Sequence, residues 1–156
     1  MSEQVSVGVL APLVGYHLRR ASAAFSADFA LAMEGAGLRQ VPFAVLSVVA
    51  ANPGINQGAV GRLLGIKRAN MVSLINELVD MRLIERTIVP TDRRAFSLGI
   101  TGVGSVALAD AVGRIEQNEL RMLADMNSEE RATLLDLLTR IERRSPPSET
   151  DENGVG

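Results

Sequence analysis

The spacing of apolar residues predicts a chain that begins with two helices. Apolar side chains recur at roughly helical spacing over residues 9–34, and Gly35 and Gly37 then stop the pattern. A second, very apolar helix is expected over residues 42–50, because the fixed φ of Pro42 suits the first turn of a helix. The first third of the chain therefore predicts two helices joined by a turn that contains glycine.

A pair of shorter helices is predicted next. Asn52-Pro53-Gly54 is a turn signal, and Asn56 is a good N-cap for a helix over 57–64, which Gly65 ends. A further helix over 67–81 carries its apolar residues on one face. Two consecutive short helices joined by a glycine-containing turn are typical of a helix-turn-helix, although many helical proteins contain such a pair.

Beyond this pair the pattern changes from helical to extended. Residues 86–89 favour a strand, residues 90–94 favour a turn, and residues 95–100 alternate apolar and polar side chains. These segments predict a two-stranded hairpin directly after the second helix of the pair. A helix-turn-helix followed by a hairpin is far more specific than the pair alone, and it describes a winged helix.

Two more helices and a polar tail are predicted at the C-terminal end. Thr101 can cap a helix over 101–124, and Ser128 can cap a helix over 128–144. Residues 145–156 have almost nothing to bury, and we expect them to form a disordered acidic tail. The expected fold is thus mainly α, a winged helix-turn-helix with six helices and a small β-hairpin wing.

The composition argues against several classes of protein. The chain has no cysteine and one histidine, His17, which leaves no cysteine zinc site, no two-histidine metal site and no thiol sensor. It has no nucleophile motif, no phosphate-binding glycine loop and no acid/base pair at a readable spacing, so we expect neither an enzyme nor a cofactor. No apolar run reaches the about 20 residues of a membrane helix, and the N-terminal segment is a poor signal peptide. We therefore expect a cytoplasmic protein.

Positive charge is concentrated in the predicted winged helix. Between residues 61 and 94, seven basic residues stand against four acidic ones, a net charge of +3 in a chain whose total is −2. A basic region in an otherwise acidic protein is typical of a surface that meets phosphates. An ordinary solvated charged face is the alternative, and the order of the motifs favours DNA binding over it.

Several short motifs follow one another between residues 52 and 104. They read Asn52-Pro53-Gly54-Ile55-Asn56-Gln57, Leu63-Leu64-Gly65-Ile66, Asn70-Met71-Val72-Ser73-Leu74-Ile75-Asn76-Glu77-Leu78, Leu83-Ile84-Glu85-Arg86, Asp92-Arg93-Arg94 and Thr101-Gly102-Val103-Gly104. In this order they resemble the MarR (multiple antibiotic resistance regulator) family of bacterial winged-helix transcription factors. The Asp-Arg-Arg set before Thr-x-x-Gly is the most specific part, and the flanking helices agree in number and length.

The resemblance implies a homodimeric regulator. Family members interlock through their first, fifth and sixth helices, here 9–34 and 101–144, beside a DNA-binding lobe at about 38–100, so that residues 1–144 form a single domain. A two-fold dimer implies a pseudo-palindromic operator with half-sites about 10 bp apart. The resemblance also implies a repressor that a small ligand releases from double-stranded DNA, commonly an aromatic acid or its coenzyme A thioester. Apolar helices at both ends of the chain need a partner, which favours a dimer independently.

The resemblance places the helix that begins at Lys67 in the major groove. Arg68 can hold guanine through two hydrogen bonds and Asn70 can hold adenine in the same way, with helix capping as the alternative role of Asn70. Ser73 and Asn76 lie one turn further on, and plain solvent exposure is the alternative for Asn76. Basic side chains on phosphates position the protein without specifying sequence. The predicted DNA contacts are Arg62, Lys67, Arg68, Asn70, Ser73, Asn76, Arg86, Arg93 and Arg94.

In the wing, the resemblance implies that Asp92 pairs with an arginine and fixes the turn. Arg94 is the expected pair, and Arg93 would then enter the minor groove, where narrow A·T tracts attract arginine. The reverse assignment stays open, and a surface salt bridge without a DNA role is the alternative. The family usually has glycine at the position of Arg82. If the chain turns left-handed there, Arg82 carries a strain of about 1 kcal/mol.

A cluster on the first helix is the candidate ligand site. Tyr16, His17 and Arg20 fall within one turn, and an arginine beside a phenol and an imidazole can hold a carboxylate or a phenolate. Phe43 and Leu46 can supply an apolar wall, since the pocket of family members generally lies between the first, second and fifth helices. A place in the dimer interface or in solvent is the alternative for the cluster.

One other function fits the same fold. A winged helix can serve as a protein-interaction module without sequence-specific DNA binding. A protein-docking face would not need the basic residues of the predicted recognition helix and wing, which favours the DNA-binding regulator.

Overall fold

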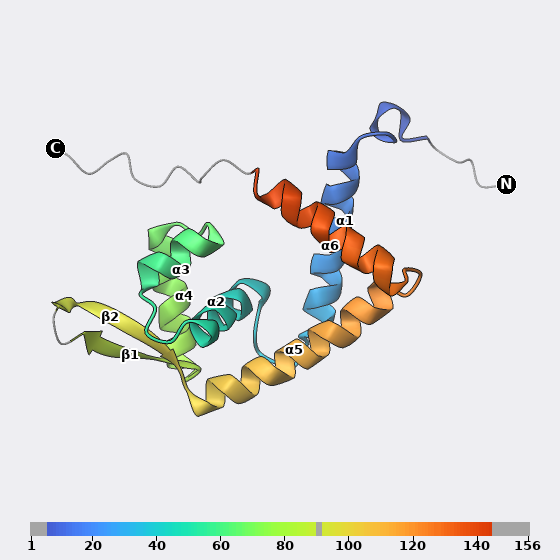
Figure 1. Ribbon diagram of the computed structural model, residues 1–156. Coiled ribbons are helices and arrows are strands. Elements are labelled where there is room, and N and C mark those ends of the chain that lie inside the picture. Colours follow the sequence, from blue (N-terminus) through green and yellow to red (C-terminus); the bar gives the residue numbers. More distant parts are fainter. Residues whose placement is uncertain (1–5, 90–91, 145–156) are drawn as a thin grey trace, which may run out of the picture.

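The computed structural model describes residues 6–89 and 92–144, with the backbone alone at residue 89 and residues 92–95. Figure 1 shows that α2, α3, α4 and the hairpin form one lobe, which we call the winged-helix lobe, while α1, α5 and α6 lie to one side of it. The elements are a 3-10 turn at Gly8–Leu10, α1 (Val14–Ala32), α2 (Gln40–Ala51), α3 (Gln57–Leu64), α4 (Arg68–Asp80), β1 (Ile84–Val89), β2 (Asp92–Ile100), α5 (Gly102–Met122) and α6 (Ser128–Glu142). The predicted mainly α fold with a winged helix-turn-helix is confirmed. Among the described helices, none is both long and apolar enough to cross a membrane.

The hydrophobic core lies in the winged-helix lobe. Its most deeply buried side chains are Val45, Leu46, Val49, Val60, Met71, Ile75, Leu78, Ile84 and Leu98. Each such side chain contributes about 1.5–3 kcal/mol when it leaves water. By contrast, α1 and α6 contain no fully buried residue. The lobe therefore holds α4 firmly, whereas the two terminal helices keep their apolar side chains partly in solvent.

The hairpin, or wing, is antiparallel and extends the lobe. Ile84 pairs with Ile100 and Arg86 pairs with Leu98, so β1 begins two residues before the predicted Arg86. The predicted alternation places Leu98 in the core. Phe96 lies on the same face but is 45% exposed, because that part of the hairpin extends past the helices of the lobe.

Capping residues set where several helices begin and end. The side chain of Asn56 accepts a hydrogen bond in the first turn of α3, and Gly65 ends that helix with a φ of +65°, as predicted. For α6 the prediction was wrong, since its N-cap is Asn127 and not Ser128. The Asn127 side chain accepts from the N–H of Glu130, three residues later. The Glu130 carboxylate accepts in turn from the N–H of Asn127, which completes a capping box.

α4 begins at Arg68, one residue after the predicted Lys67. Two other helices begin further from the predicted residue, and proline explains both of these differences. α1 begins at Val14, after the 3-10 turn, because Pro12 has no N–H with which to continue a helix from residue 9. α2 begins at Gln40, two residues before Pro42. Proline is tolerated there, since the N–H groups of the first turn have no partner inside the helix.

α4 is followed by an arginine, Arg82, whose backbone has the left-handed conformation. The N–H of Arg82 donates to the carbonyl of Val79 and the N–H of Leu83 donates to the carbonyl of Leu78, both at 2.9 Å, which is a Schellman motif. Arg82 has a φ of +59° and is the one non-glycine residue with positive φ among those described. Because a Cβ in this conformation crowds the following carbonyl, the strain expected at Arg82 is present.

Replacing Arg82 with glycine is expected to raise the free energy of unfolding by about 0.5–1 kcal/mol. Glycine removes the crowding of Cβ, although its greater freedom in the unfolded chain offsets part of the gain. Urea unfolding measures the change. Arg62→Gly is the control, because this residue lies in the last turn of α3. Glycine should lower the free energy of unfolding there by about 0.5–1 kcal/mol. A loss of stability in both variants would contradict the strain at Arg82.

Candidate nucleic-acid interface

A close crossing with α3 positions α4. Gly61 is buried at the crossing, and a Cβ there would lie 3.0 Å from both the carbonyl oxygen of Ile66 and Cγ of Met71. The N–H of Ile66 donates to the carbonyl of Gly61 at 2.8 Å, which ties the turn to α3. With Met71 and Ile75 buried, the inner face of α4 is fixed and its opposite face is presented to solvent.

The outer face of α4 carries four of the predicted DNA contacts. Arg68, Asn70, Ser73 and Asn76 are all exposed. Lys67 occupies the N-cap position, and the helix has no side-chain capping bond. Asn70 is therefore not the cap of α4, and its exposed amide is accessible to a base edge.

Further predicted contacts flank this face. Arg62 is exposed in the last turn of α3, on the element that precedes α4. The backbone of Asp92, Arg93 and Arg94 forms the start of β2, but their side chains lie outside the described residues. The pairing of Asp92 and the minor-groove role of Arg93 or Arg94 stay predictions.

Two of the predicted contacts meet each other. Arg86 of β1 donates a hydrogen bond from Nη2 to Oδ1 of Asn76, at 2.5 Å. Both side chains are exposed, and they join the wing to the outer face of α4. The sequence predicted them as separate contacts, since nothing in the spacing of residues 76 and 86 links a helix to a strand.

An ion pair that the sequence did not predict holds another residue of α4. Arg39, the N-cap of α2, donates to both carboxylate oxygens of Glu77, at 2.7 and 2.9 Å. The Arg39 side chain is 73% exposed, so the pair stabilises the fold little. Its effect is electrostatic, because it neutralises the acid beside Asn76.

The end of α4 is joined to the start of α5 through Thr101. Its hydroxyl donates to the carbonyl of Arg82 at 2.6 Å and accepts from the N–H of Gly104 at 2.9 Å. Its N–H donates to the carbonyl of Leu83 at 3.0 Å. A Cβ at Gly104 would overlap the carbonyl oxygen of Leu83. We call this arrangement the α4–α5 joint, and it ties the start of α5 to the residues that end α4.

The predicted ligand cluster lies near the start of α1. Arg20 donates to the hydroxyl of Tyr16 at 3.3 Å, and the guanidinium groups of Arg19 and Arg20 stack within 6 Å of the Tyr16 ring. His17 forms a hydrogen bond with the carbonyl of Ala11 at 2.8 Å. The cluster is thus a cationic surface with its tyrosine only partly buried.

The predicted apolar wall lies elsewhere. Phe43 packs against Phe29 of α1, with ring centroids 5.9 Å apart, and Leu46 is fully buried in the core. Phe29 stands 13 residues after Tyr16 on the same helix, which is about 20 Å at 1.5 Å per residue. Within one chain the structure therefore does not bring the wall and the cluster together, and Leu46 is inaccessible to a ligand.

A hollow lies between the end of α1 and the start of α2, and none of the predicted ligand residues lines it. Its lining includes Phe29, Met33, Leu38 and Arg39. Arg39 is also the partner of Glu77, so this hollow borders a residue that contacts α4. The lining is mainly apolar, and its one basic residue, Arg39, is held by Glu77.

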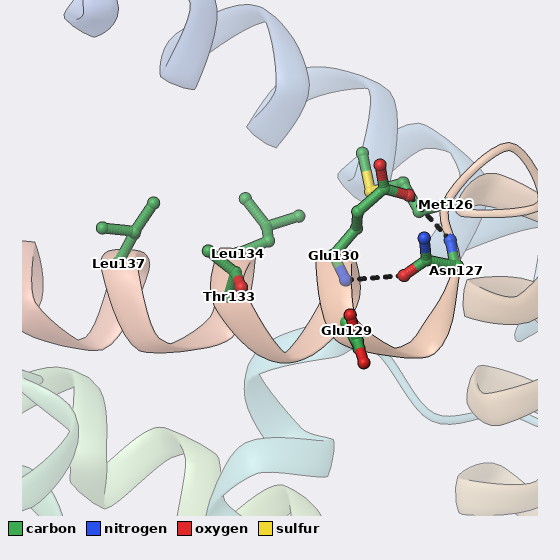
Figure 2. A pocket seen from close by; sticks show the side chains of 7 residues that line it. All are labelled: Met126, Asn127, Glu129, Glu130, Thr133, Leu134 and Leu137. Carbon is green, nitrogen blue, oxygen red and sulfur yellow. Dashed lines mark hydrogen bonds between the residues drawn. The ribbon is translucent and has the colours of Figure 1, made fainter.

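α6 presents an apolar face that the rest of the described chain leaves uncovered. Leu134 and Leu137 lie along one side of the helix, with Met126 at its start, and line a shallow groove (Figure 2). Leu137 is 46% exposed. α6 makes at most marginal contact with any other described element. Soluble proteins rarely leave such a face in water, and an exposed apolar face of this kind is typical of a protein–protein contact surface.

The corner between α5 and α6 is fixed by one arginine. Arg131 donates to the carbonyls of Leu123 and Met126, at 3.0 and 3.1 Å. These carbonyls lie at and just beyond the C-terminal end of α5, where a cation also suits the helix dipole. The direction of α6 relative to α5 is therefore set by side-chain hydrogen bonds.

Comparisons with known proteins agree with this geometry. Residues 36–95 match a family model described as the MarR family. Over 151 residues the chain is 36% identical to a putative transcriptional regulatory protein for the hcr operon of Thauera aromatica. This match covers 94% of this chain and 87% of that protein. The transcriptional repressor CouR bound to a 23-mer DNA duplex is 34% identical, with a TM-score of 0.86 and coverage of 90% of this chain and all of that one. CouR bound to p-coumaroyl-CoA is 32% identical, with a TM-score of 0.79 and coverage of 90% and 99%.

Proposed function

This chain belongs to the MarR family of transcriptional regulators, and from that premise we propose that it is a homodimeric, ligand-responsive repressor of a pseudo-palindromic operator. The observation that carries the proposal is the exposed face of α4, with Arg68, Asn70 and Ser73, beside a wing. An α-helix fits the major groove, and the N-terminal half of a recognition helix reads the bases. A similar repressor has been solved on a DNA duplex, which supports the same use of α4 here.

The uncovered faces of the terminal helices support the dimer. α1 and α6 have no fully buried residue, and Leu137 and Ile141 of α6 are both 46% exposed. A second copy of the chain would cover these faces. A two-fold axis would then place two α4 helices about 34–36 Å apart, one helical turn of DNA, so that each reads one half-site.

For the effector, we propose an aromatic acid or its coenzyme A thioester. The apolar hollow with Phe29, Met33 and Arg39 suits the aromatic part. The cationic cluster of Tyr16 and Arg20 lies about 20 Å from Phe29 along α1, too far to hold the carboxylate of an aromatic acid bound in the hollow, but it suits the phosphates of a coenzyme A thioester. p-Coumaroyl-CoA is the first probe to add to the DNA complex, because a similar repressor has been solved with it bound.

Replacing Arg68 with alanine is expected to weaken operator binding by about tenfold to a hundredfold. Arg68 is the first residue of α4, and a bidentate arginine–guanine contact is worth about 1–3 kcal/mol. Gel-shift titration at two salt concentrations, on the DNA just upstream of the chain's own gene and on random DNA, measures the change. Wild-type binding should fall steeply as salt increases.

Arg140→Ala is the matched control. It removes the same side chain from α6, where Arg140 pairs only loosely with Asp136 at 3.6 Å. We expect it to bind DNA like the wild type. Binding that is equal on specific and random DNA, in a selection from random duplexes as well, would favour the protein-interaction module instead.

A further inference from the structure

We propose that Arg86 and Asn76 act as one reading unit that selects hydrogen-bond acceptors, so that Asn76 reads guanine and not adenine. The inference rests on the proposed DNA binding and assigns a base preference to one position of α4. It starts from the hydrogen bond that joins the wing to the helix, between Arg86 Nη2 and Asn76 Oδ1.

The backbone explains why the two side chains meet. Arg86 pairs directly with Leu98 across the hairpin, and directly paired residues of an antiparallel ladder leave it on the same face. Leu98 is 1% exposed, so this face of the hairpin is the one packed toward the helices. Arg86 therefore leaves the wing on the side of α4, and Asn76 lies on the outer face of that helix.

The chemistry of arginine fixes which atom of the Asn76 amide faces it. A guanidinium group has five N–H donors and no acceptor, so only the amide oxygen can be its partner. Arg86 thus takes one of the two lone pairs of Oδ1, and its positive charge and bulk beside that oxygen disfavour a second donor such as adenine N6, while the two donors of Nδ2 are directed elsewhere. An asparagine that reads adenine needs Oδ1 and Nδ2 together, one to accept from N6 and one to donate to N7.

The residues around Arg86 and Asn76 favour a surface that donates hydrogen bonds and accepts none. Arg86 has no ion pair with another residue of the described chain. Glu77, the acid next to Asn76, is held on both oxygens by Arg39. The unit therefore presents N–H groups and a positive charge. Of the four base edges in the major groove, guanine offers two acceptors side by side, N7 and O6.

Selection of bound duplexes from a random pool tests the assignment with wild type, Asn76→Ala and Arg86→Ala. The base positions whose preference disappears in Asn76→Ala define what Asn76 reads. There we expect the wild type to prefer guanine. Arg86→Ala releases Oδ1, so the ratio of adenine to guanine at those positions should rise about fivefold or more.

Two further variants serve as controls. Arg86→Lys still places a donor near Oδ1 and should keep the guanine preference, whereas Arg62→Ala should weaken all duplexes alike if Arg62 contacts phosphate. An adenine preference of the wild type at the Asn76-dependent positions, no such positions, or an unchanged ratio in Arg86→Ala would each overturn the assignment while DNA binding stands. A wild type that binds no duplex would overturn the proposed function together with it.

Discussion

Alanine at position 104 is expected to lower the free energy of unfolding by about 3 kcal/mol or more. The added Cβ would overlap the carbonyl oxygen of Leu83 and lie 2.9 Å from Cγ1 of Ile100. The Leu83 carbonyl cannot simply move away, because it accepts the hydrogen bond of the Thr101 N–H. Overpacking costs about 1–3 kcal/mol when side chains can yield, and here the obstacle is backbone. Denaturant unfolding of Gly104→Ala measures the loss.

Gly113→Ala is the matched control for this prediction. It makes the same change in the same helix, but a Cβ at residue 113 meets no atom within 4 Å. Alanine is the better helix former, so this variant should gain about 0.5–1 kcal/mol. The two variants should therefore change stability in opposite directions. If both gain stability, the α4–α5 joint is not a tight contact.

Glutamate at position 137 is expected to convert the dimer to a monomer and to weaken operator binding about a hundredfold or more. Leu137 lies in the uncovered apolar face of α6 (Figure 2), where a second copy would bury the new charge without a partner. A monomer binds one half-site and loses the gain from two linked contacts, which is about 10²–10⁴-fold. Sedimentation at equilibrium gives the mass, and a DNA titration gives the affinity.

The control variant is Ala132→Glu, which adds the same charge to the exposed opposite face of α6 and should stay dimeric. Circular dichroism should show both variants folded, because α6 contributes no fully buried residue to the core. A Leu137→Glu protein with unchanged mass and unchanged affinity would contradict the proposed role of α6.

Local signals were enough to predict most of the fold. Asn56 and Gly65 bound α3 as the sequence indicates, since capping depends on side chains within a few residues of each other. The N-cap of α6 was predicted wrongly although the sequence held the information. Asn127, unlike Ser128, has a glutamate three residues later, and the capping box requires that spacing.

Contacts between distant elements could not be predicted in the same way. Arg39 and Glu77 are 38 positions apart, and helical periodicity says which face of a helix is apolar but not which element covers it. The same limit explains Leu46, which the family resemblance led us to expect in a pocket wall and which the structure places in the core. The DNA-contact residues remain predictions from motif order and exposure.

In the proposed dimer, the α4–α5 joint connects the terminal helices to the DNA-binding helix through the full length of α5. α5 has 21 residues, about 32 Å at 1.5 Å per residue, and it is fixed to α4 at one end and, through Arg131, to α6 at the other. A tilt of α5 by about 5° about its α6 end would displace the end joined to α4 by roughly 3 Å, which is close to the 3.4 Å rise of one base pair. In the proposed dimer, a small rearrangement of the terminal helices would therefore displace α4 relative to its half-site by close to one base-pair step.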